Sequence, residues 1–155
     1  MGMEIERKFT IKELPDDLDS YDHHIIEQAY LTTTPTIRVR REDDRYYMTY
    51  KGVGGCNTSL AHEEYNLALT AEAYDTLSSK ADGNIIRKTR YLIPYGKHTI
   101  ELDVFAEPFE TLIIAEVEFD STDEAYDFKP PAWFLEDVTD REEYRNSYLS
   151  RQPVR

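Results

Sequence analysis

Hydrophobic and polar residues alternate along most of this chain, the pattern of strands that bury one face. Eight segments carry the pattern and are rich in β-branched residues and tyrosine: 2–11, 24–33, 36–42, 45–52, 60–69, 84–95, 97–106 and 110–120. Turn residues such as Pro35, Asp43-Asp44 and Pro94-Tyr95-Gly96 mark short gaps between several of them. Short gaps favour antiparallel hairpins, so the pattern predicts a closed barrel or a strongly curled sheet.

Helical periodicity is confined to a few segments. Residues 70–80 combine a capping Thr70, an early Glu72 and apolar residues at helical spacing, and this helix is expected to end near Gly83. Residues 13–20 and 121–128 are weaker helical candidates. A C-terminal helix is predicted over 140–151, with its start near Thr139 or Asp140.

Length and composition limit the classes of protein that this chain can represent. A chain of 155 residues matches one ordinary domain, which we place over 1–155. No apolar run of roughly 18 residues or signal-like start is present, so a soluble, cytoplasmic protein is expected. The formal charge of -13 argues against nucleic acid and anionic membrane as partners. Cys56 is the single cysteine and has no intramolecular disulfide partner.

Charged residues fall on one face of their strands. In the first strand Glu4, Glu6 and Lys8 share a face, whereas apolar residues and Arg7 occupy the other. The same parity recurs in later strands, where the pairs on one face are Arg38 and Arg40, Thr49 and Lys51, Lys88 and Arg90, Glu101 and Asp103, and Glu116 and Glu118. Any one such strand is better explained by an antiparallel sheet with a solvated face.

Two features of the set point beyond a solvated surface. Like charges stand next to each other on one strand face, which is unfavourable without counter-charges. Cations also dominate some strands and carboxylates others, so a closed sheet with these faces inward has a polar lumen with a cationic wall and an acidic wall. Arg and Lys bind phosphoryl oxygens, and carboxylates hold Mg²⁺ or Mn²⁺. The combination favours metal-assisted transfer of a phosphoryl group to water.

The segment Glu4-Ile-Glu-Arg-Lys8 resembles the first strand of the CYTH superfamily, the triphosphate tunnel metalloenzymes, which carries Glu-x-Glu-x-Lys. Later strands of that family are matched in order, from residue 3 to about 149. The matching segments are Ile37-Arg-Val-Arg40, Thr49-Tyr-Lys51, Lys88-Thr-Arg-Tyr91, Glu101-Leu-Asp-Val-Phe105, Ala115-Glu-Val-Glu-Phe119, Glu136-Asp-Val-Thr139 and Tyr144-Arg-Asn146. The resemblance implies a mainly β (α+β) fold, a closed eight-stranded antiparallel β-barrel forming a tunnel open at both ends, with peripheral helices and a C-terminal helix.

The resemblance also implies roles for individual residues. Those expected to hold phosphoryl oxygens are Lys8, Arg38, Arg40, Lys51, Lys88 and Arg90. Those expected at metal are Glu4, Glu6, Glu64, Asp103, Glu116 and Glu118, and the catalytic set is Glu4, Glu6 and Lys8. The cofactor implied is Mg²⁺ or Mn²⁺. Glu101 is either a further ligand or a counter-ion to a tunnel cation.

The fifth strand departs from the family pattern. His62, Glu64 and Asn66 share the inward face where the family often has Arg-x-Glu-x-Glu, so only Glu64 keeps its type. This leaves the completeness of a second metal position open, and His62 is interpreted as a wall residue. Whether Arg145 of the C-terminal helix reaches the tunnel is also left open.

Hydrolysis of inorganic triphosphate (tripolyphosphate) to diphosphate and phosphate is the function predicted for this metal-dependent triphosphatase. Alternatives within the same resemblance are a class IV adenylyl cyclase and a thiamine or nucleoside triphosphatase, and a different class is a non-catalytic polyphosphate-binding module. Tyr30 and Tyr47 are the aromatic residues nearest to the expected lumen, and they do not by themselves indicate a base pocket. The partner is a small triphosphate, and a homodimer is left open.

Overall fold

The structure, a computed structural model, describes residues 2–52 and 61–153. Cys56, and Leu60 at the start of the strand predicted over 60–69, lie outside these residues. The elements follow the order β1 (Gly2–Ile11), η1 (Leu18–Ser20), β2 (His23–Thr33), β3 (Thr36–Glu42), β4 (Arg45–Lys51), β5 (Ala61–Ala68), α1 (Ala71–Ser79), β6 (Asp82–Tyr95), β7 (His98–Phe105), β8 (Ile113–Glu118), α2 (Thr122–Asp127), β9 (Phe134–Asp137), η2 (Glu142–Tyr144) and α3 (Asn146–Ser150).

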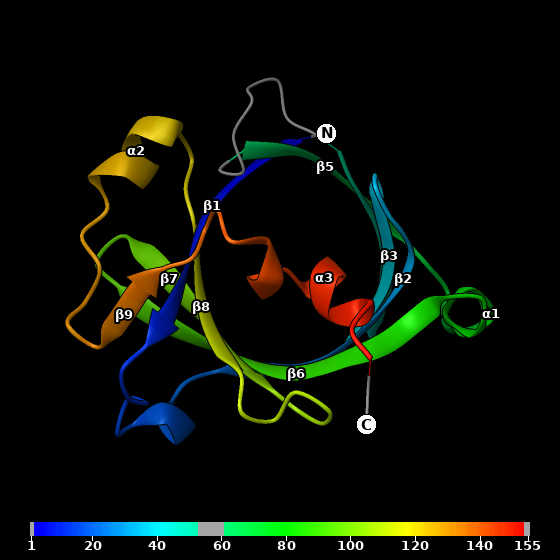
Figure 1. The fold of residues 1–155 in the computed structure, drawn as a ribbon, viewed down its shortest axis with the longest axis horizontal. Helices are drawn as coiled ribbons and strands as arrows, with labels where there is room; N and C mark the ends of the chain where they lie inside the picture. The colour runs from blue at the N-terminus through cyan, green and yellow to red at the C-terminus, as the bar shows by residue number, and fades with distance from the viewer. Residues whose placement is uncertain (1, 53–60, 154–155) are drawn as a thin grey trace.

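Eight strands close into an antiparallel barrel, as predicted (Figure 1). Around the ring the order is β5-β4-β3-β2-β6-β7-β8-β1, and β1 pairs again with β5. Closure places Glu4 opposite His62, and Glu6 and Lys8 opposite Glu118 and Glu116. The charged faces of neighbouring strands therefore meet inside the barrel.

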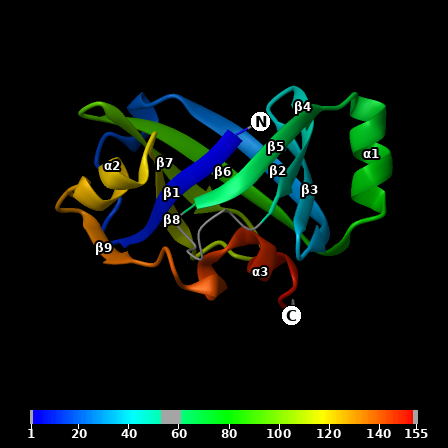
Figure 2. The same cartoon turned by 90° about the horizontal axis from the view of Figure 1, so that it is seen from above.

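The hydrophobic core lies mainly outside the barrel wall, between the strands and the elements that cover them (Figure 2). On one side Tyr74 of α1 packs with Ala29 and Val39. On the other side Phe9 and Phe134 pack with residues of α2 and the loop after it. Because the apolar faces are buried against this outer layer, the polar faces are left to line the lumen.

The predicted turns form with the expected chemistry. Asp43, between β3 and β4, has φ 56°, in the left-handed region that Asp tolerates better than most residues. Gly96, between β6 and β7, has φ 60°, where a side chain is disfavoured. The helix over 70–80 also forms, and the hydroxyl of Thr70 accepts the backbone N–H of Ala73 at 3.1 Å.

Three predicted segments differ in the structure. The first helical candidate, over 13–20, is reduced to the short 3₁₀ helix η1, and the strand predicted over 110–120 is limited to β8. The C-terminal helix predicted over 140–151 is divided into η2 and α3, with Arg145 in extended conformation (φ -82°, ψ 140°) between them. The ninth strand of the described chain, β9, was not predicted, because four residues are too few to show an alternating pattern.

The C-terminal segment lies at one end of the predicted tunnel (Figure 2). In Figure 1 η2 and α3 project inside the outline of the ring, and Figure 2 places α3 at one end of the barrel. Leu149 of α3 packs with Tyr30, Ile86 and Phe105. One end of the barrel is therefore partly covered. No helix within residues 2–52 and 61–153 is long and apolar enough to cross a membrane.

Candidate functional site

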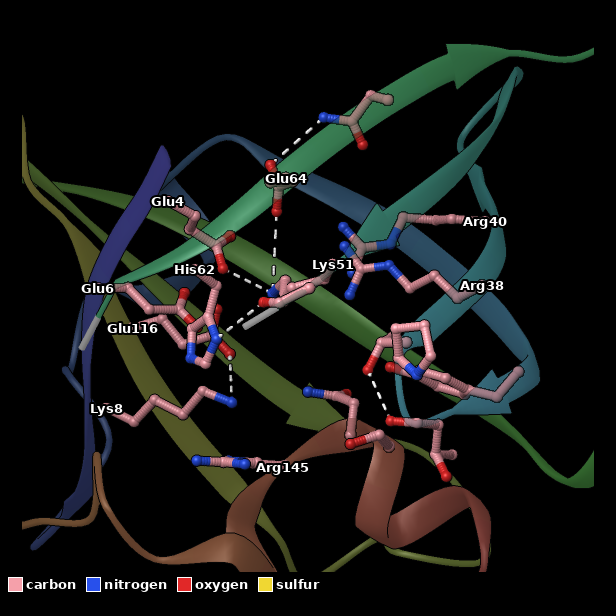
Figure 3. Close-up of a pocket in the computed structure, with 18 of the residues that line it drawn as sticks. Glu4, Glu6, Lys8, Arg38, Arg40, Lys51, His62, Glu64, Glu116 and Arg145 are labelled. Atoms are coloured by element: carbon pink, nitrogen blue, oxygen red, sulfur yellow. Dashed lines mark hydrogen bonds and ion pairs between the residues drawn. The ribbon is translucent and has the colours of Figure 1, made fainter. Parts of the chain in front are cut away.

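The lumen contains a cavity of about 570 Å³ (Figure 3). Charged side chains from every strand of the ring except β2 line it, and Tyr30 comes from β2. The predicted residues that line it are Glu4, Glu6, Lys8, Arg38, Arg40, Lys51, His62, Glu64, Asn66, Lys88, Arg90, Glu101, Glu116 and Glu118, joined by Tyr30 and Tyr47. Strand parity thus located the cavity correctly, and Asp103 is the one predicted site residue that does not line it.

The cationic wall contains two buried guanidinium groups from β3. Arg38 and Arg40 are 9% and 5% exposed, and within the described chain neither forms an ion pair with a carboxylate. Nε of Arg38 is buried without a hydrogen-bond partner, whereas Nε of Arg40 donates to Oε1 of Gln28 at 2.8 Å. Burial and the neighbouring charge of Arg38 lower the pKa of Arg40. Two buried like charges without a carboxylate are suited to binding an anion.

The acidic wall gathers three carboxylates from two paired strands. Oxygen atoms of Glu4, Glu6 and Glu118 lie within 4.8 Å of one another. Burial and the charges of Glu4 and Glu116 raise the pKa of Glu6 to about 7, and burial and the nearby carboxylates, Glu101 foremost, raise the pKa of Glu118 to about 8. Such crowding of carboxylates is unfavourable until a cation offsets it, so these residues fit a divalent metal ion.

Glu4 and the other predicted metal residues of the cavity, Glu64 and Glu116, lie beside cations. Nζ of Lys51 lies 2.6 Å from Oε1 of Glu4 and 3.8 Å from Oε2 of Glu64 (Figure 3). Glu116 lies between Nζ of Lys8 at 3.8 Å and Nη2 of Arg90 at 3.2 Å. Although burial acts in the opposite direction, these cations hold the pKa of Glu116 below its ordinary value.

Asp103 is fully buried beside two cations of β6. Its Oδ2 accepts from Nζ of Lys88 at 2.6 Å, and its carboxylate accepts from Nε and Nη2 of Arg90 at 2.7 and 2.9 Å. Burial would raise the pKa of Asp103, but Arg90 and Lys88 lower it. The structure therefore places Asp103 behind the cationic wall, where it orients two cations, and apart from the carboxylates that fit a metal.

This geometry predicts a large effect on stability for Asp103→Asn. Because the neutral amide leaves Lys88 and Arg90 without their buried counter-ion, we expect the free energy of unfolding to fall by about 3 kcal/mol. The melting temperature of the metal-free protein should fall by roughly 10 °C. Glu124→Gln, which breaks the exposed pair with Lys97, is the control and should change it by about 2 °C or less. If Asp103 instead held metal, only the stabilisation by added Mg²⁺ would decrease.

The counter-ion interpretation of Glu101 agrees with its contacts. Oε2 of Glu101 accepts from Nη1 of Arg90 at 3.3 Å, and its Oε1 is buried without a hydrogen-bond partner. Burial raises the pKa of Glu101 to about 7. Glu101 and Glu118 also line a smaller cavity beside Lys97 and His98.

The unusual fifth strand supplies a hydrogen-bonded wall. The hydroxyl of Thr49 donates to Oδ1 of Asn66 at 2.6 Å, and Nδ2 of Asn66 donates to Oε1 of Glu64 at 3.3 Å. Nδ1 of His62 lies 3.3 Å from the carbonyl oxygen of Gly52. Asn66 thus orients Glu64 next to Lys51, and Glu64 is not among the three clustered carboxylates.

The sequence alone assigned no role to Gln28 or Asn146 and left that of Arg145 open. Gln28, which holds Arg40, has the inward parity of Tyr30, so its signal was present in the alternating pattern of β2. Arg145 does reach the cavity (Figure 3), and Asn146 next to it accepts from Nζ of Lys88 at 3.1 Å. No periodicity revealed these two, because their positions depend on how the C-terminal segment crosses the barrel end.

Comparison with known proteins decides the family. The family model described as CYTH domain matches residues 2–151. The chain belongs to the CYTH family. An inorganic triphosphatase of Nitrosomonas europaea is 39% identical over 155 residues, which cover 95% of this CYTH chain and 96% of that protein. An inorganic triphosphatase of Acetivibrio thermocellus is 33% identical over 159 residues, 100% of this chain and 97% of that protein.

Solved structures agree with the architecture of this CYTH protein. A crystal structure of an inorganic triphosphatase has a TM-score of 0.71 at 33% identity and covers 99% of this chain and 98% of that chain. The structure of a Pyrococcus horikoshii protein has a TM-score of 0.60 at 18% identity and covers 80% of this chain and 84% of that chain. The second likeness shows the fold alone.

Proposed function

We propose that this CYTH protein hydrolyses inorganic triphosphate to diphosphate and phosphate with the help of Mg²⁺ or Mn²⁺. The observation that carries the proposal is the division of one cavity into two walls. Arg38 and Arg40 offer buried cations without carboxylate partners in the described chain, and the Glu4–Glu6–Glu118 cluster offers clustered oxygens. The two inorganic triphosphatases that it resembles over nearly their whole length support the same activity.

The cationic residues bind the phosphoryl oxygens in this proposal. Arg38 and Arg40 each present several N–H donors in a fixed plane, which suits the oxygens of a phosphate chain. The ammonium groups of Lys8, Lys51 and Lys88, together with Arg90, contribute from the neighbouring strands. Asp103, Glu116 and Glu64 act as positioning residues, because each already contacts one or two of these cations.

Glu4, Glu6 and Glu118 are the residues assigned to hold the divalent cation. Their clustered oxygen atoms and raised pKa values fit a hard cation with oxygen ligands. When bound, such a cation supplies charge neutralisation for the phosphoryl group and activation of water. This chain's own part is to hold three carboxylates on adjacent strands facing the phosphate-binding cations.

The proposed reaction is attack of water on a terminal phosphorus, with cleavage of the bond to the bridging oxygen. The leaving diphosphate keeps the electron pair of that bond, and the products are phosphate and diphosphate. Arg38, Arg40 and Lys8 stabilise negative charge on the transferred group, and a first-strand carboxylate orients the attacking water. Fixed cations around the chain hold it in line for attack.

Inorganic triphosphate is favoured over ATP because the lining aromatic groups are already engaged. Tyr30 is buried and its hydroxyl accepts from Nε2 of Gln28 at 2.9 Å. The hydroxyl of Tyr47 donates to Oε1 of Glu42 at 3.1 Å and accepts from Nη1 of Arg40 at 3.2 Å. The Tyr30 ring is buried and the guanidinium of Arg40 lies 5.9 Å from the centroid of the Tyr47 ring, so charge is the main feature that the cavity offers for recognition.

Phosphate release from tripolyphosphate, ATP and thiamine triphosphate tests the proposal with Mg²⁺, Mn²⁺ or Ca²⁺. We expect tripolyphosphate to have a kcat/KM at least about tenfold above that of ATP, a difference of about 1.4 kcal/mol in transition-state binding. Added EDTA should abolish turnover. Accumulation of cyclic AMP would favour a cyclase, and tight tripolyphosphate binding without phosphate release would favour a binding module.

The choice between Mg²⁺ and Mn²⁺, the homodimer, the cytoplasmic location and the single domain over 1–155 stay predictions. The same holds for the absence of nucleic acid and membrane partners. Size-exclusion chromatography with light scattering tests the homodimer, and the metal panel above tests the cation.

A further inference from the structure

We propose that Asn84, which does not line the cavity, is a positioning residue for the triphosphate: it holds the C-terminal segment that brings Arg145 and Asn146 to the cationic wall. The inference rests on the proposed function and deepens it. It assigns part of the substrate affinity to the contact between the start of strand β6 and the segment that contains α3.

Asn84 binds two carbonyl groups at the end of α3. Its Nδ2 donates to the carbonyl oxygen of Leu149 at 3.0 Å and to that of Gln152 at 2.6 Å. The Leu149 carbonyl lies in the last turn of α3 and also accepts the backbone N–H of Gln152 at 3.2 Å, whereas the Gln152 carbonyl lies just beyond the helix. The adjacent Gly83 has φ +82°, and a Cβ there would overlap the carbonyl oxygen of Ser150. Gly83 and Asn84 therefore form a close-fitting seat for the helix end.

This seat is needed because α3 is not stable as an isolated helix. A helix of five residues is far too short to be stable alone, so its place is set by its contacts with the barrel. Leu149 contributes an apolar contact to the cluster of Tyr30, Ile86 and Phe105. The hydrogen bonds of Asn84 add to this apolar contact and fix the orientation of the segment relative to the barrel.

The other end of the same segment reaches the cationic side chains that are proposed to bind the substrate. Asn146 is 7% exposed, and its Oδ1 accepts from Nζ of Lys88 at 3.1 Å. Arg145 points into the cavity (Figure 3), and no carboxylate of the described chain forms an ion pair with it. Loss of the seat would thus displace one phosphate-binding candidate and remove a hydrogen-bond acceptor from another.

Asn84→Ala tests the inference through a separation of KM from kcat. We expect KM for tripolyphosphate to rise about tenfold with kcat changed by about twofold or less, the effect of losing a charge-assisted contact. Asn84→Asp keeps the shape and removes both donors, so it should behave like Asn84→Ala. Thr70→Ala, which removes the cap of α1 on the outer face, is the stability control and should leave KM unchanged.

A double-mutant cycle decides whether Asn84 acts through the segment. In an Arg145→Ala background the rise in KM caused by Asn84→Ala should shrink to about threefold or less, because the displaced group is already absent. An equal rise in both backgrounds, or an unchanged KM in Asn84→Ala, would overturn the inference. Wild-type protein that releases no phosphate would instead contradict the proposed function.

Hydrogen exchange of wild-type protein gives a test that needs no variant. If the segment is part of the site, saturating tripolyphosphate in EDTA should slow exchange of the Leu149 and Arg151 amides severalfold, by reciprocity of coupled equilibria. These amides donate to the carbonyls of Arg145 and Tyr148. Slower exchange in the cationic strands with no change at Leu149 and Arg151 would show that the segment is not coupled to the ligand.

Discussion

Glu6→Gln should remove activity and at the same time stabilise the metal-free protein. The neutral amide keeps the shape of Glu6 but weakens the cluster with Glu4 and Glu118, so kcat/KM should fall roughly 10³-fold. In wild type, burial and like charges raise the pKa of Glu6 to about 7, which makes its ionised form unfavourable in the folded state. Removing that charge should raise the metal-free melting temperature at pH 8 by about 5 °C.

The pH dependence gives this prediction a definite sign. Between the ordinary pKa of 4.5 and the folded pKa of about 7, the folded state keeps a proton on Glu6 that the unfolded state has lost. Stability contributed by this group therefore decreases as pH rises through that interval. Metal-free wild type should lose stability from about pH 5 to pH 8, and Glu6→Gln should show a weaker slope.

Thermal unfolding with and without about 5 mM Mg²⁺ measures how much the bound metal stabilises the folded protein. Mg²⁺ should raise the melting temperature of wild type and raise that of Glu6→Gln much less. Glu110→Gln, an exposed turn residue, is the matched control. A Glu6→Gln protein with wild-type turnover would exclude Glu6 from the metal cluster.

Arg38→Ala should weaken triphosphate binding with little loss of stability. Arg38 is buried without a carboxylate partner in the described chain, so its charge is available to an anion. We expect kcat/KM for tripolyphosphate to fall about a hundredfold, mostly through KM. Removal of the charge ends the repulsion with Arg40 and also the attraction to Glu4, which, against the opposing effect of burial, helps to raise the pKa of Arg38, so the metal-free melting temperature should stay within about 3 °C of wild type.

Arg87→Ala is the matched control for this experiment. Arg87 belongs to β6, pairs with Glu27 at 3.1 Å and is half exposed, and it does not line the cavity. Its kinetics should equal those of wild type. The stabilisation by Mg²⁺ should persist in Arg38→Ala, because the carboxylate cluster is intact. Loss of that stabilisation, or an unchanged KM, would contradict the division of the cavity into an anion wall and a metal wall.

Much of the cavity was predictable because strand parity is a local property. Alternate residues of a strand share a face whatever the strand packs against, so Glu4 and Glu6 had to point the same way, as did Arg38 and Arg40. The apolar residues that alternate with them had to point to the opposite face, which is the face that the outer helices cover. Gln28 has the same inward parity as Tyr30, but its role as a partner of Arg40 needed the structure.

The different roles of the individual carboxylates could not be predicted from the alternating pattern. Asp103 and Glu118 have the same parity and chemistry in sequence, yet the register of β6 with β7 sets Asp103 opposite Arg90, and that of β1 with β8 sets Glu118 opposite Glu6. One carboxylate therefore orients cations, and the other joins a cluster that fits a metal. Register between strands is a long-range choice, which single-strand periodicity does not contain.

By itself, the sequence determined the barrel strands, their inward and outward faces, most turns, and the balance of cations and carboxylates in the lumen. Only the tertiary structure decided the ion pairs, the position of β9 and the placement of Arg145 and Asn146 at one end of the barrel. The physical reason is distance along the chain. Turn and strand preferences act between near neighbours, whereas the C-terminal segment is placed by contacts with Gly83 and Asn84, more than 60 residues earlier.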